Sequence, residues 1–232
     1  MIQKTLIPNI TTRRVAGPFD DVRKGIQRIR ITEGCPNSCP FCKEPSESKS
    51  YPIPTITRRY VQILDMNLTA RADAIHLVWQ LGQLRVKNKP VFYELVCGID
   101  YRYLDQELAN WLHSSHFIRP RIAWDMSYGE QGRIKKSIWM LKAAGYKPES
   151  IIVFILCNWR ISYAENCRKL DLLKVWNVKV GDCYFDGQVS PNITPIFWTA
   201  PQIHEFRKRT RKHNQIVLFK YDPQQTIKIK EI

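Results

Sequence analysis

The chain has 232 residues, of which 44% are hydrophobic, and a net charge of +15 at pH 7 from 36 Lys and Arg against 21 Asp and Glu. This composition excludes disordered and fibrous proteins and fits one globular domain better than two small ones. No apolar run is long enough to cross a bilayer, and the N-terminal residues lack the apolar segment of a signal peptide, so we expect a cytoplasmic protein with no membrane partner.

The excess of positive charge predicts attraction to polyanions through the release of their counterions, and nucleic acid is the plainest such partner. Charge alone gives association without specificity, so a protein that is merely basic is an equal alternative. Candidate catalytic and metal-binding residues are needed to distinguish a nucleic-acid-binding protein from one that is merely basic.

From residue 26 onward, short apolar segments alternate with segments of helical periodicity. Strand patterns cover residues 26–32, 59–67, 91–98, 119–127, 150–158 and 178–185. Helical patterns cover residues 72–86, 103–117, 134–146 and 162–177. Ser162 and Glu165 have the spacing of a capping box, and Gly145 stands where a helix C-cap belongs. Six strand-then-helix units predict a parallel sheet with outer helices, open-wound or curled toward a barrel.

The segments outside this series differ in character. Residues 44–58 are rich in Pro and Ser and predict a loop, and an irregular stretch after residue 186 precedes a basic helical run over residues 203–215. We therefore expect an N-terminal extension over residues 1–25, a core over residues 26–187, and a basic C-terminal extension over residues 188–232 that packs on the core or closes it.

Polar side chains stand at the carboxyl ends of the predicted strands, the edge at which parallel α/β folds bind ligands. Each alone is explained by a turn or a helix cap, but their common position at one rim favours a site. They are the cysteine loop after the first strand and Asp65, Asn67, Asp100, Asp125, Ser127, Asn158 and Asp182.

The cysteine loop reads GCPNSCPFCKEP and places Cys35, Cys39 and Cys42 at C-x3-C-x2-C spacing. Seven cysteines, an odd number with no export signal, argue against a disulfide framework and favour metal or redox use. A structural zinc site needs a fourth Cys or His at short spacing, and the sequence offers none. An iron-sulfur cubane held by three thiolates would leave one iron open, as a catalytic metal site requires.

This motif, directly after a first strand and within Gly-Cys-Pro and Pro-Phe-Cys, resembles that of the radical S-adenosylmethionine (radical SAM) superfamily. The strand-helix units are similar to its partial (βα)6 barrel. The resemblance implies that Cys35, Cys39 and Cys42 hold a [4Fe-4S] cluster whose fourth iron binds S-adenosylmethionine. It also implies reductive cleavage to a 5'-deoxyadenosyl radical that abstracts a substrate hydrogen, with an external electron donor of the flavodoxin or ferredoxin type.

The resemblance further implies residues that contact S-adenosylmethionine. Phe41, just before the third cysteine, would pack beside the adenine, and Asn158 would approach the adenine from the fifth strand. Asp125 and Ser127 stand where ribose hydroxyls are bound.

The family's Gly-Gly-Glu stretch, which binds the methionine amino group, is replaced here by Asp-Met-Asn at residues 65–67. Asp65 would offer a carboxylate and Asn67 a carbonyl in its place. No auxiliary cluster and no cobalamin domain are expected, so the resemblance is to a minimal catalytic core.

Glu94 interrupts the apolar third strand. A buried Glu needs a partner, so we expect an ion pair with an interior Arg, either Arg28 or Arg30.

The substrate is predicted from charge alone. The basic run at residues 207–213 and the basic aromatic pieces at residues 58–60 and 159–160 could follow a phosphate backbone and stack bases, although a solvated helix face explains the first as well. We expect a nucleic-acid base as the substrate, with a peptide or protein, or a small nucleotide-like metabolite, as alternatives. A non-enzymatic, zinc-stapled nucleic-acid-binding protein is the alternative from another class.

Overall fold

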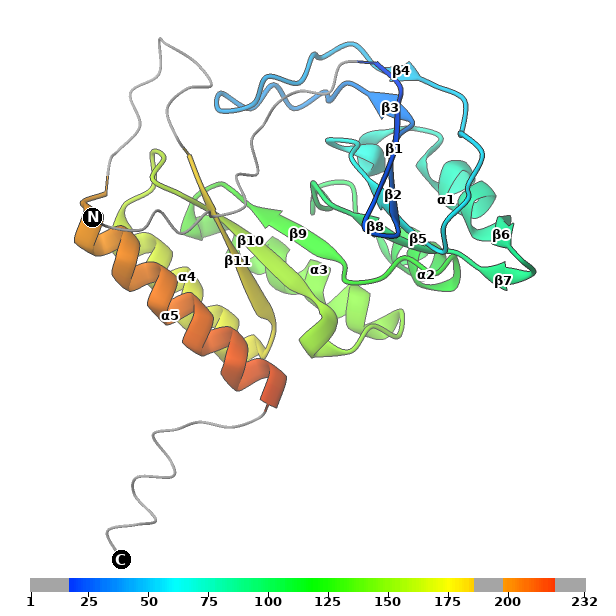
Figure 1. The fold of residues 1–232 in the computed structure, drawn as a ribbon. Coiled ribbons are helices and arrows are strands. Elements are labelled where there is room, and N and C mark those ends of the chain that lie inside the picture. The colour runs from blue at the N-terminus through cyan, green and yellow to red at the C-terminus, as the bar shows by residue number, and fades with distance from the viewer. Residues whose placement is uncertain (1–16, 186–197, 220–232) are drawn as a thin grey trace, which may run out of the picture.

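The computed structural model describes residues 17–185 and 198–219, which form a mixed α/β fold built on parallel strands (Figure 1). The predicted parallel α/β fold is confirmed. In chain order the parallel strands are β2 (Ile26–Arg30), β5 (Tyr60–Ile63), β8 (Phe92–Leu95), β9 (Arg121–Trp124), β10 (Ile152–Cys157) and β11 (Lys179–Tyr184).

Neighbouring strands in space follow the order of the chain. Strands β2, β5 and β8 form one sheet, with β1 (Phe19–Arg23) antiparallel at its edge, and β9, β10 and β11 form a second. Single parallel bridges from Tyr93 to Phe117 and from Ile99 to Ile122 join the two sheets. Within the described residues β1, on the outer side of β2, and β11 are not paired with each other, so the strands do not close into a barrel.

Helices follow five of the six parallel strands. They are α1 (Ala74–Gln83), α2 (Gln106–Ser114), α3 (Gln131–Ala143), α4 (Tyr163–Trp176) and α5 (Ala200–Phe219). Helix α5 packs against β11 and α4. No helix within residues 17–185 and 198–219 combines the length and apolarity needed to span a bilayer.

The smaller elements are short 3-10 helices and two hairpins. The 3-10 helices are η1 (Leu68–Ala70), η2 (Tyr128–Glu130) and η3 (Pro148–Ser150). One hairpin joins β3 (Thr32–Glu33) to β4 (Lys49–Ser50), and the other joins β6 (Arg85–Val86) to β7 (Lys89–Pro90).

The structure corrects two of the sequence predictions. The first strand-then-helix unit has no helix, because the chain between β2 and β5 forms the cysteine loop and the hairpin of β3 and β4. The helix predicted over residues 72–86 ends at Gln83, because Lys87 and Asn88, at φ of 51° and 60°, reverse the chain into the hairpin of β6 and β7.

The N-terminal extension predicted over residues 1–25 is described only from residue 17. There, Lys24 and Gly25 both have positive φ and turn β1 back onto β2. Most of the irregular stretch predicted after residue 186 lies in residues 186–197, outside the described residues, as do residues 220–232. The boundaries of the three predicted segments stay predictions.

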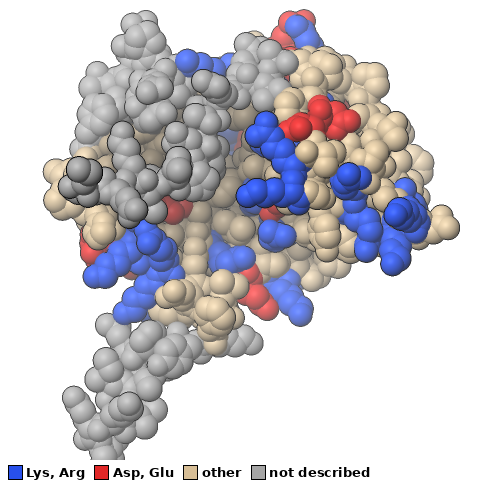
Figure 2. Space-filling view, viewed as in Figure 1, with Lys and Arg blue, Asp and Glu red and all other residues tan. Residues whose placement is uncertain are grey.

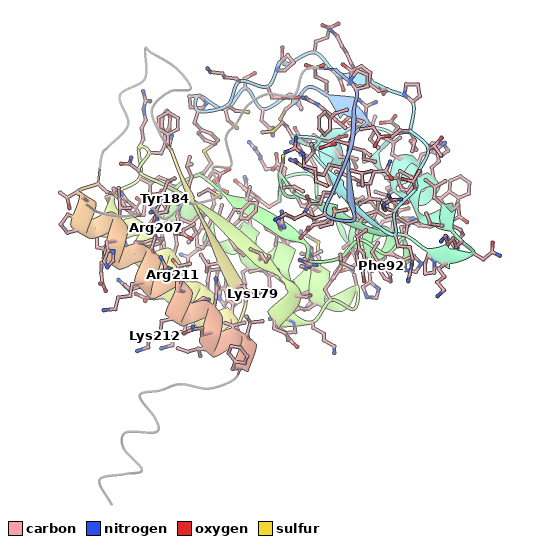
Figure 3. All side chains as sticks on the ribbon, in the orientation of Figure 1. Phe92, Lys179, Tyr184, Arg207, Arg211 and Lys212 are labelled. Atoms are coloured by element: carbon pink, nitrogen blue, oxygen red, sulfur yellow. The ribbon has the colours of Figure 1, made fainter. Side chains whose placement is uncertain are left out.

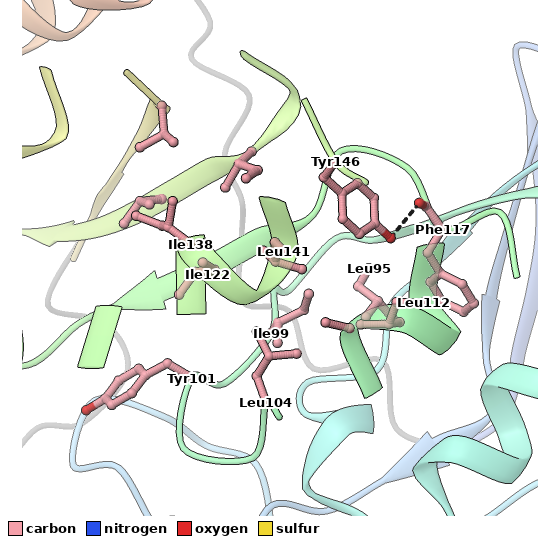
Figure 4. Packing of buried hydrophobic residues seen from close by; sticks show 14 of the residues in the cluster. Leu95, Ile99, Tyr101, Leu104, Leu112, Phe117, Ile122, Ile138, Leu141 and Tyr146 are labelled. Atoms are coloured by element: carbon pink, nitrogen blue, oxygen red, sulfur yellow. Dashed lines mark hydrogen bonds between the residues drawn. The ribbon is translucent and has the colours of Figure 1, made fainter. Parts of the chain in front are cut away.

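The helices cover one face of the strands with apolar side chains. Val153 and Ile155 on β10 are fully buried, while Ile152 and Phe154 point to the opposite face and are half-buried. Figure 4 shows Ile122 packed with Ile138 and Leu141 of α3 in this core. Full burial of such a side chain contributes about 1.5–3 kcal/mol, so this layer supplies much of the driving force for folding.

Caps at two helix ends were predicted, and the structure has both. Gly145 follows α3 with φ of 109°, a conformation that glycine adopts without strain. Ser162 Oγ accepts a hydrogen bond from the Glu165 amide at 3.2 Å. The Glu165 carboxylate does not return to Ser162 but accepts from the Tyr128 amide at 2.5 Å, which ties α4 to η2.

Lys169 is a fully buried lysine on α4. Its Nζ donates to the carbonyl oxygens of Trp124, at 3.3 Å, and Met126, at 2.6 Å, and lies 5.2 Å from the centre of the Trp124 ring. Burial lowers the pKa of Lys169 to about 8, because the charged form is poorly solvated there. The side chain therefore holds the carboxyl end of β9 against α4.

We predict that Lys169→Met removes a pH dependence of stability. In the folded protein Lys169 loses its proton near pH 8, whereas in the unfolded chain it does so near its ordinary pKa of 10.5. The unfolded state binds more protons between these values, so the stability of the wild type relative to the variant should rise by about 3 kcal/mol from pH 7.5 to 10.5. Chemical denaturation across this range measures it. Lys174→Met, on the exposed side of α4, controls for the lost charge, and a flat difference for Lys169→Met would contradict the prediction.

Candidate functional site

A buried ion pair closes the cysteine loop at its base. Arg30 Nη2, at the end of β2, lies 2.5 Å from Glu44 Oε1, and both side chains are almost fully buried. The same carboxylate oxygen accepts from the Gly34 amide at 2.7 Å, and the Cys35 amide donates to the Pro45 carbonyl at 2.8 Å. The two ends of the loop are therefore fastened together at the carboxyl end of β2.

Gly34 lets the chain enter the loop. Its φ is 100°, and a Cβ at this position would collide with the backbone carbonyl of Glu47. Only glycine satisfies both conditions, so Cys35 depends on Gly34 for its place.

The three loop cysteines line one pocket at the carboxyl ends of the strands. The other residues around it are Asn37, Phe41, Met66, Asn67, Cys97, Gly98, Ile99, Asp100, Tyr101, Arg102, Ala123, Asp125 and Met126. They come from the loop and from the ends of β5, β8 and β9. The rim predicted from the sequence thus gathers Asn67, Asp100 and Asp125 beside the cysteines.

Each loop sulfur has a polar group beside it. Asn67 Nδ2 donates to Cys35 Sγ at 3.3 Å, the Glu44 amide donates to Cys42 Sγ at 3.4 Å, and the cationic Arg102 lies near enough to Cys39 to favour its thiolate. Burial raises the pKa of the Cys39 and Cys42 thiols, and these groups oppose it by favouring the thiolates.

The donor set suits thiolate ligation. Within residues 17–185 and 198–219 no three His, Cys, Asp or Glu side chains are gathered tightly enough to hold a metal ion. Three thiols that line one pocket, two of them with an N–H donor, are nevertheless the ligand type that iron-sulfur clusters use, and hydrogen bonds to the sulfurs tune such clusters. The residues present therefore fit a cluster held by Cys35, Cys39 and Cys42.

Asp100 is the centre of the hydrogen-bond network in the pocket. Its Oδ2 accepts from Asn67 Nδ2 at 3.1 Å, from Arg102 Nη2 at 2.8 Å and from Asn37 Nδ2. Its Oδ1 accepts from Arg102 Nε at 2.8 Å, and this ion pair raises the pKa of Arg102. The sequence analysis named Asp100 but missed Asn37 and Arg102. The only signal for Arg102 is its position two residues after Asp100, across a turn.

Asp65 and Asn67, predicted together for the methionine amino group, differ in position. Asp65 is buried away from the pocket, and its two oxygens accept from the Ile31 amide at 3.0 Å and from Thr32 Oγ1 at 2.5 Å. Burial raises its pKa to about 6 although these hydrogen bonds oppose the shift. Asn67 lines the pocket, and its Oδ1 accepts from Thr69 Oγ1 at 3.1 Å.

Asp125 and Ser127, predicted for ribose hydroxyls, also differ. Asp125 lines the pocket and makes no hydrogen bond to any of the described residues. Burial raises the pKa of Asp125 to about 6, with the charge of Lys169 opposing. Ser127 is exposed to solvent and does not line the pocket.

Phe41 and Asn158, predicted for the adenine, lie in the same region, because Phe41 contacts the residue that follows Asn158. Phe41 lines the pocket and its ring contacts Trp159, with 5.7 Å between ring centres, in a cluster with Leu156 and Phe185. The Asn158 amide is used within the protein, since Nδ2 donates to the Phe185 carbonyl at 3.1 Å and Oδ1 accepts from the Trp198 amide at 2.7 Å. The contact of Phe41 with this cluster therefore packs the cysteine loop against the ends of β10 and β11.

The predicted partner of Glu94 is wrong. Glu94 Oε1 pairs with Arg121 Nη2 at 2.5 Å, while Arg30 is engaged by Glu44 and Arg28 makes no ion pair with Glu94. The reason is topological, because β8 and β9 are neighbours and Glu94 and Arg121 share the face away from the helices.

No protein-family model and no curated protein matches this sequence. Among solved structures, the chain is similar to the radical S-adenosylmethionine methyltransferase TsrM from Kitasatospora setae, with cobalamin and a [4Fe-4S] cluster bound, at 11% identity and a TM-score of 0.55, over 68% of this chain and 36% of that one. It is also similar to coproporphyrinogen III oxidase (HemN) from Escherichia coli, a radical SAM enzyme, at 10% identity and a TM-score of 0.50, over 65% of this chain and 38% of that one. The chain therefore has the fold of radical SAM enzymes and spans little more than a third of either neighbour's length.

We predict that Arg30→Met lowers the free energy of unfolding by about 3–5 kcal/mol, because it leaves the buried Glu44 carboxylate without its cation. Chemical denaturation at pH 7 measures the loss. Arg23→Met is the matched control, since Arg23 pairs with Asp21 at 2.7 Å with its own side chain 72% exposed. Such a surface pair contributes about 0–1 kcal/mol. Equal, small losses in the two variants would mean that Arg30 and Glu44 do not form a buried pair.

Proposed function

We propose that this chain is a radical SAM enzyme whose [4Fe-4S] cluster is held by Cys35, Cys39 and Cys42. One observation carries the proposal: the three cysteines of C-x3-C-x2-C line one pocket at the carboxyl ends of parallel strands, in a fold that is similar to radical SAM enzymes. The six parallel strands follow one another in chain order, which supports the proposal.

The cluster would supply the electron that cleaves S-adenosylmethionine reductively to methionine and a 5'-deoxyadenosyl radical, which abstracts a hydrogen from the substrate. The electron would come from an external donor of the flavodoxin or ferredoxin type. With three cysteine ligands, the fourth iron of the cluster would be left for S-adenosylmethionine.

The residues of the pocket would position the ligands. Asn67 donates to both Cys35 and Asp100, so it fixes the cysteine relative to the end of β8. Arg102 places a cation beside Cys39 and stabilises its thiolate. Asp65, buried behind the pocket, orients the chain between β2 and the loop instead of contacting S-adenosylmethionine.

Asp125 and Phe41 are the side chains best placed to contact S-adenosylmethionine. The Asp125 carboxylate has no partner in the described part of the chain and lies on the pocket wall, as an acceptor for ribose hydroxyls requires. Phe41 lines the same pocket and would offer an apolar ring to the adenine.

A nucleic-acid base is our proposed substrate, with a peptide or a nucleotide-like metabolite as competitors. The net charge of +15 and the open side of the sheet support a large anionic substrate. A zinc-stapled nucleic-acid-binding protein is the alternative from another class. The metal content of the purified protein, iron or zinc, distinguishes the two.

We predict that Cys39→Ala abolishes iron binding. The wild type, reconstituted anaerobically, should be brown and hold about four irons per chain, and after reduction it should release 5'-deoxyadenosine from S-adenosylmethionine. Iron analysis and absorption spectra measure the loss without reference to activity.

Three other cysteines provide the controls. Cys97→Ala, Cys157→Ala and Cys183→Ala should keep their iron, and Cys97 is the most stringent because it lines the same pocket and burial raises its thiol pKa to about 12. Loss of iron in any of them would mean a fourth protein ligand. Colourless wild-type protein with one zinc would overturn the radical SAM proposal.

We predict that Asp125→Asn weakens the binding of S-adenosylmethionine by about 10- to 100-fold, the worth of a hydrogen bond to a charged group, with iron content unchanged. Equilibrium dialysis against the reconstituted protein measures the affinity. Ser127→Ala is the matched control, since Ser127 is exposed and outside the pocket. Weaker binding in Ser127→Ala alone would transfer the ribose contact to Ser127.

A further inference from the structure

A row of polar side chains crosses the face of the sheet that the helices leave uncovered. Arg28, Gln62 and Glu94 are in register on β2, β5 and β8. Glu94 pairs with Arg121 on β9, and Arg121 is in register with Ile152 and Lys179 on β10 and β11. We call Arg28, Gln62, Glu94, Arg121 and Lys179 the inner polar row. In Figure 1, α3 lies behind β9 and β10, so the face of these strands that is away from α3 is turned to the viewer.

The inner polar row has more cations than its acid can neutralise. Glu94 is bound on one side by Gln62 Nε2, at 3.1 Å, and on the other by Arg121, and Arg119 lies 3.8 Å from it as well. Asp21, opposite Arg28 on β1, pairs with Arg23 instead. No other carboxylate of the described residues forms an ion pair with this row.

Lys179 and Arg28 are the uncompensated members. Neither side chain makes a hydrogen bond or an ion pair with a described residue, although both residues are half-buried. Burial lowers the pKa of Lys179, and the nearby charges of Arg119 and Arg121 lower it further. Arg121 Nε is buried and has no hydrogen-bond partner within the described residues. Like charges held together in this way destabilise the empty protein, and an anion bound among them would remove the cost.

The basic surface continues from Lys179 along α5. Figure 3 shows Arg207, Arg211 and Lys212 on α5 beside β11, and Arg207 lies 4.3 Å from the centre of the Tyr184 ring. Arg207 and Arg211 form no ion pair in the part of the chain described, and Asp182 is the acid nearest to them on β11. Figure 2 shows the same face, on which the blue Lys and Arg side chains outnumber the red acids.

Aromatic rings border the row at its other end. Tyr60 and Phe92 are in register on β5 and β8 with 5.6 Å between stacked ring centres, and Tyr60 is 51% exposed. Arg59 lies 5.5 Å from the centre of the Phe92 ring. Rings beside free cations are the combination on which single-stranded nucleic acids bind, with phosphates on the cations and bases on the rings.

The inner polar row and the cysteine pocket lie at different depths of the same sheet. Arg121 is the first residue of β9 and Asp125 directly follows its last, so the two are four residues apart, which corresponds to about 13 Å at the rise of a parallel strand. A nucleotide whose reacting atom lies at the pocket would therefore carry its phosphate toward the row.

We propose that the inner polar row, with Arg207 and Arg211, binds the phosphate groups of the substrate. The shared chemistry is a phosphate monoester or diester, supplied by a polynucleotide or by a free nucleotide. This inference rests on the proposed function for its link to catalysis, but phosphate binding can be measured without any turnover.

The experiment measures binding to the reconstituted protein of a single-stranded oligoribonucleotide and of a nucleoside monophosphate, each over a series of salt concentrations. The variants are Arg28→Gln with Lys179→Gln, and Arg207→Gln with Arg211→Gln. The matched control is Lys135→Gln with Lys136→Gln, which removes the same charge from the exposed side of α3. Thermal melting of each variant checks that it folds, and the α5 pair, on an exposed surface, guards against misfolding of the first.

The oligonucleotide should bind about tenfold more weakly to each double variant, with a salt slope shallower by about 1.4, since each phosphate contact on a single strand contributes about 0.7. The control should bind as the wild type does. Loss of mononucleotide binding alone would assign the row to a free nucleotide. Equal weakening in the control, or no binding of either probe, would overturn the proposal.

Iron content and 5'-deoxyadenosine release on the same preparations separate the two proposals. Normal iron and cleavage without phosphate binding would overturn the phosphate site alone. Phosphate binding by a protein that holds no iron would overturn the radical SAM function and leave the phosphate site standing.

Discussion

The buried ion pair between Arg30 and Glu44 is the constraint on which the site depends. Removing two charges from water is expensive, and the cost is recovered only when the remaining hydrogen-bonding positions are filled. Here the Gly34 amide and the Thr32 carbonyl fill them, so one pair fixes both ends of the cysteine loop to the end of β2. The loop then has no need of a helix of its own. Its path over the strand ends is fixed by its base and by the contact of Phe41 with Trp159 at the far side.

The polar side chains of the pocket form a hydrogen-bond network centred on Asp100. Asp100 accepts hydrogen bonds from Asn37, Asn67 and Arg102. Asn67 also donates to Cys35, and the charge of Arg102 favours the Cys39 thiolate. Such a network makes this part of the pocket rigid, because the polar side chains in it are hydrogen-bonded to one another. Asp125 is the exception in the pocket. An acid without a partner in a half-buried pocket is costly to keep, and this cost distinguishes it from the structural carboxylates Asp65 and Asp100.

The sequence was sufficient for the features that depend on local patterns. The order of strands and helices, the caps at Ser162 and Gly145 and the position of the cysteine loop follow from periodicity and turn chemistry, which act over a few residues. Partners across the fold could not be predicted in this way. Glu94 pairs with Arg121 because β8 and β9 are neighbours, and Asp65 accepts a hydrogen bond from the Thr32 hydroxyl because β5 lies beside β2. Such choices depend on the register between strands, which no single segment encodes.

β1 and β11 are the outer strands of the two sheets in the described residues. Helices pack on one face of the strands, and the inner polar row lies on the other face, with the cysteines at the strand ends. Asn214 of α5 already occupies the free edge of β11 at Val180, with hydrogen bonds of 2.8 Å to its amide and carbonyl. Helix α5 thus blocks pairing of a further strand at that point and places Arg207 and Arg211 along the same edge. The edge of β11 is therefore protected against strand addition at this point.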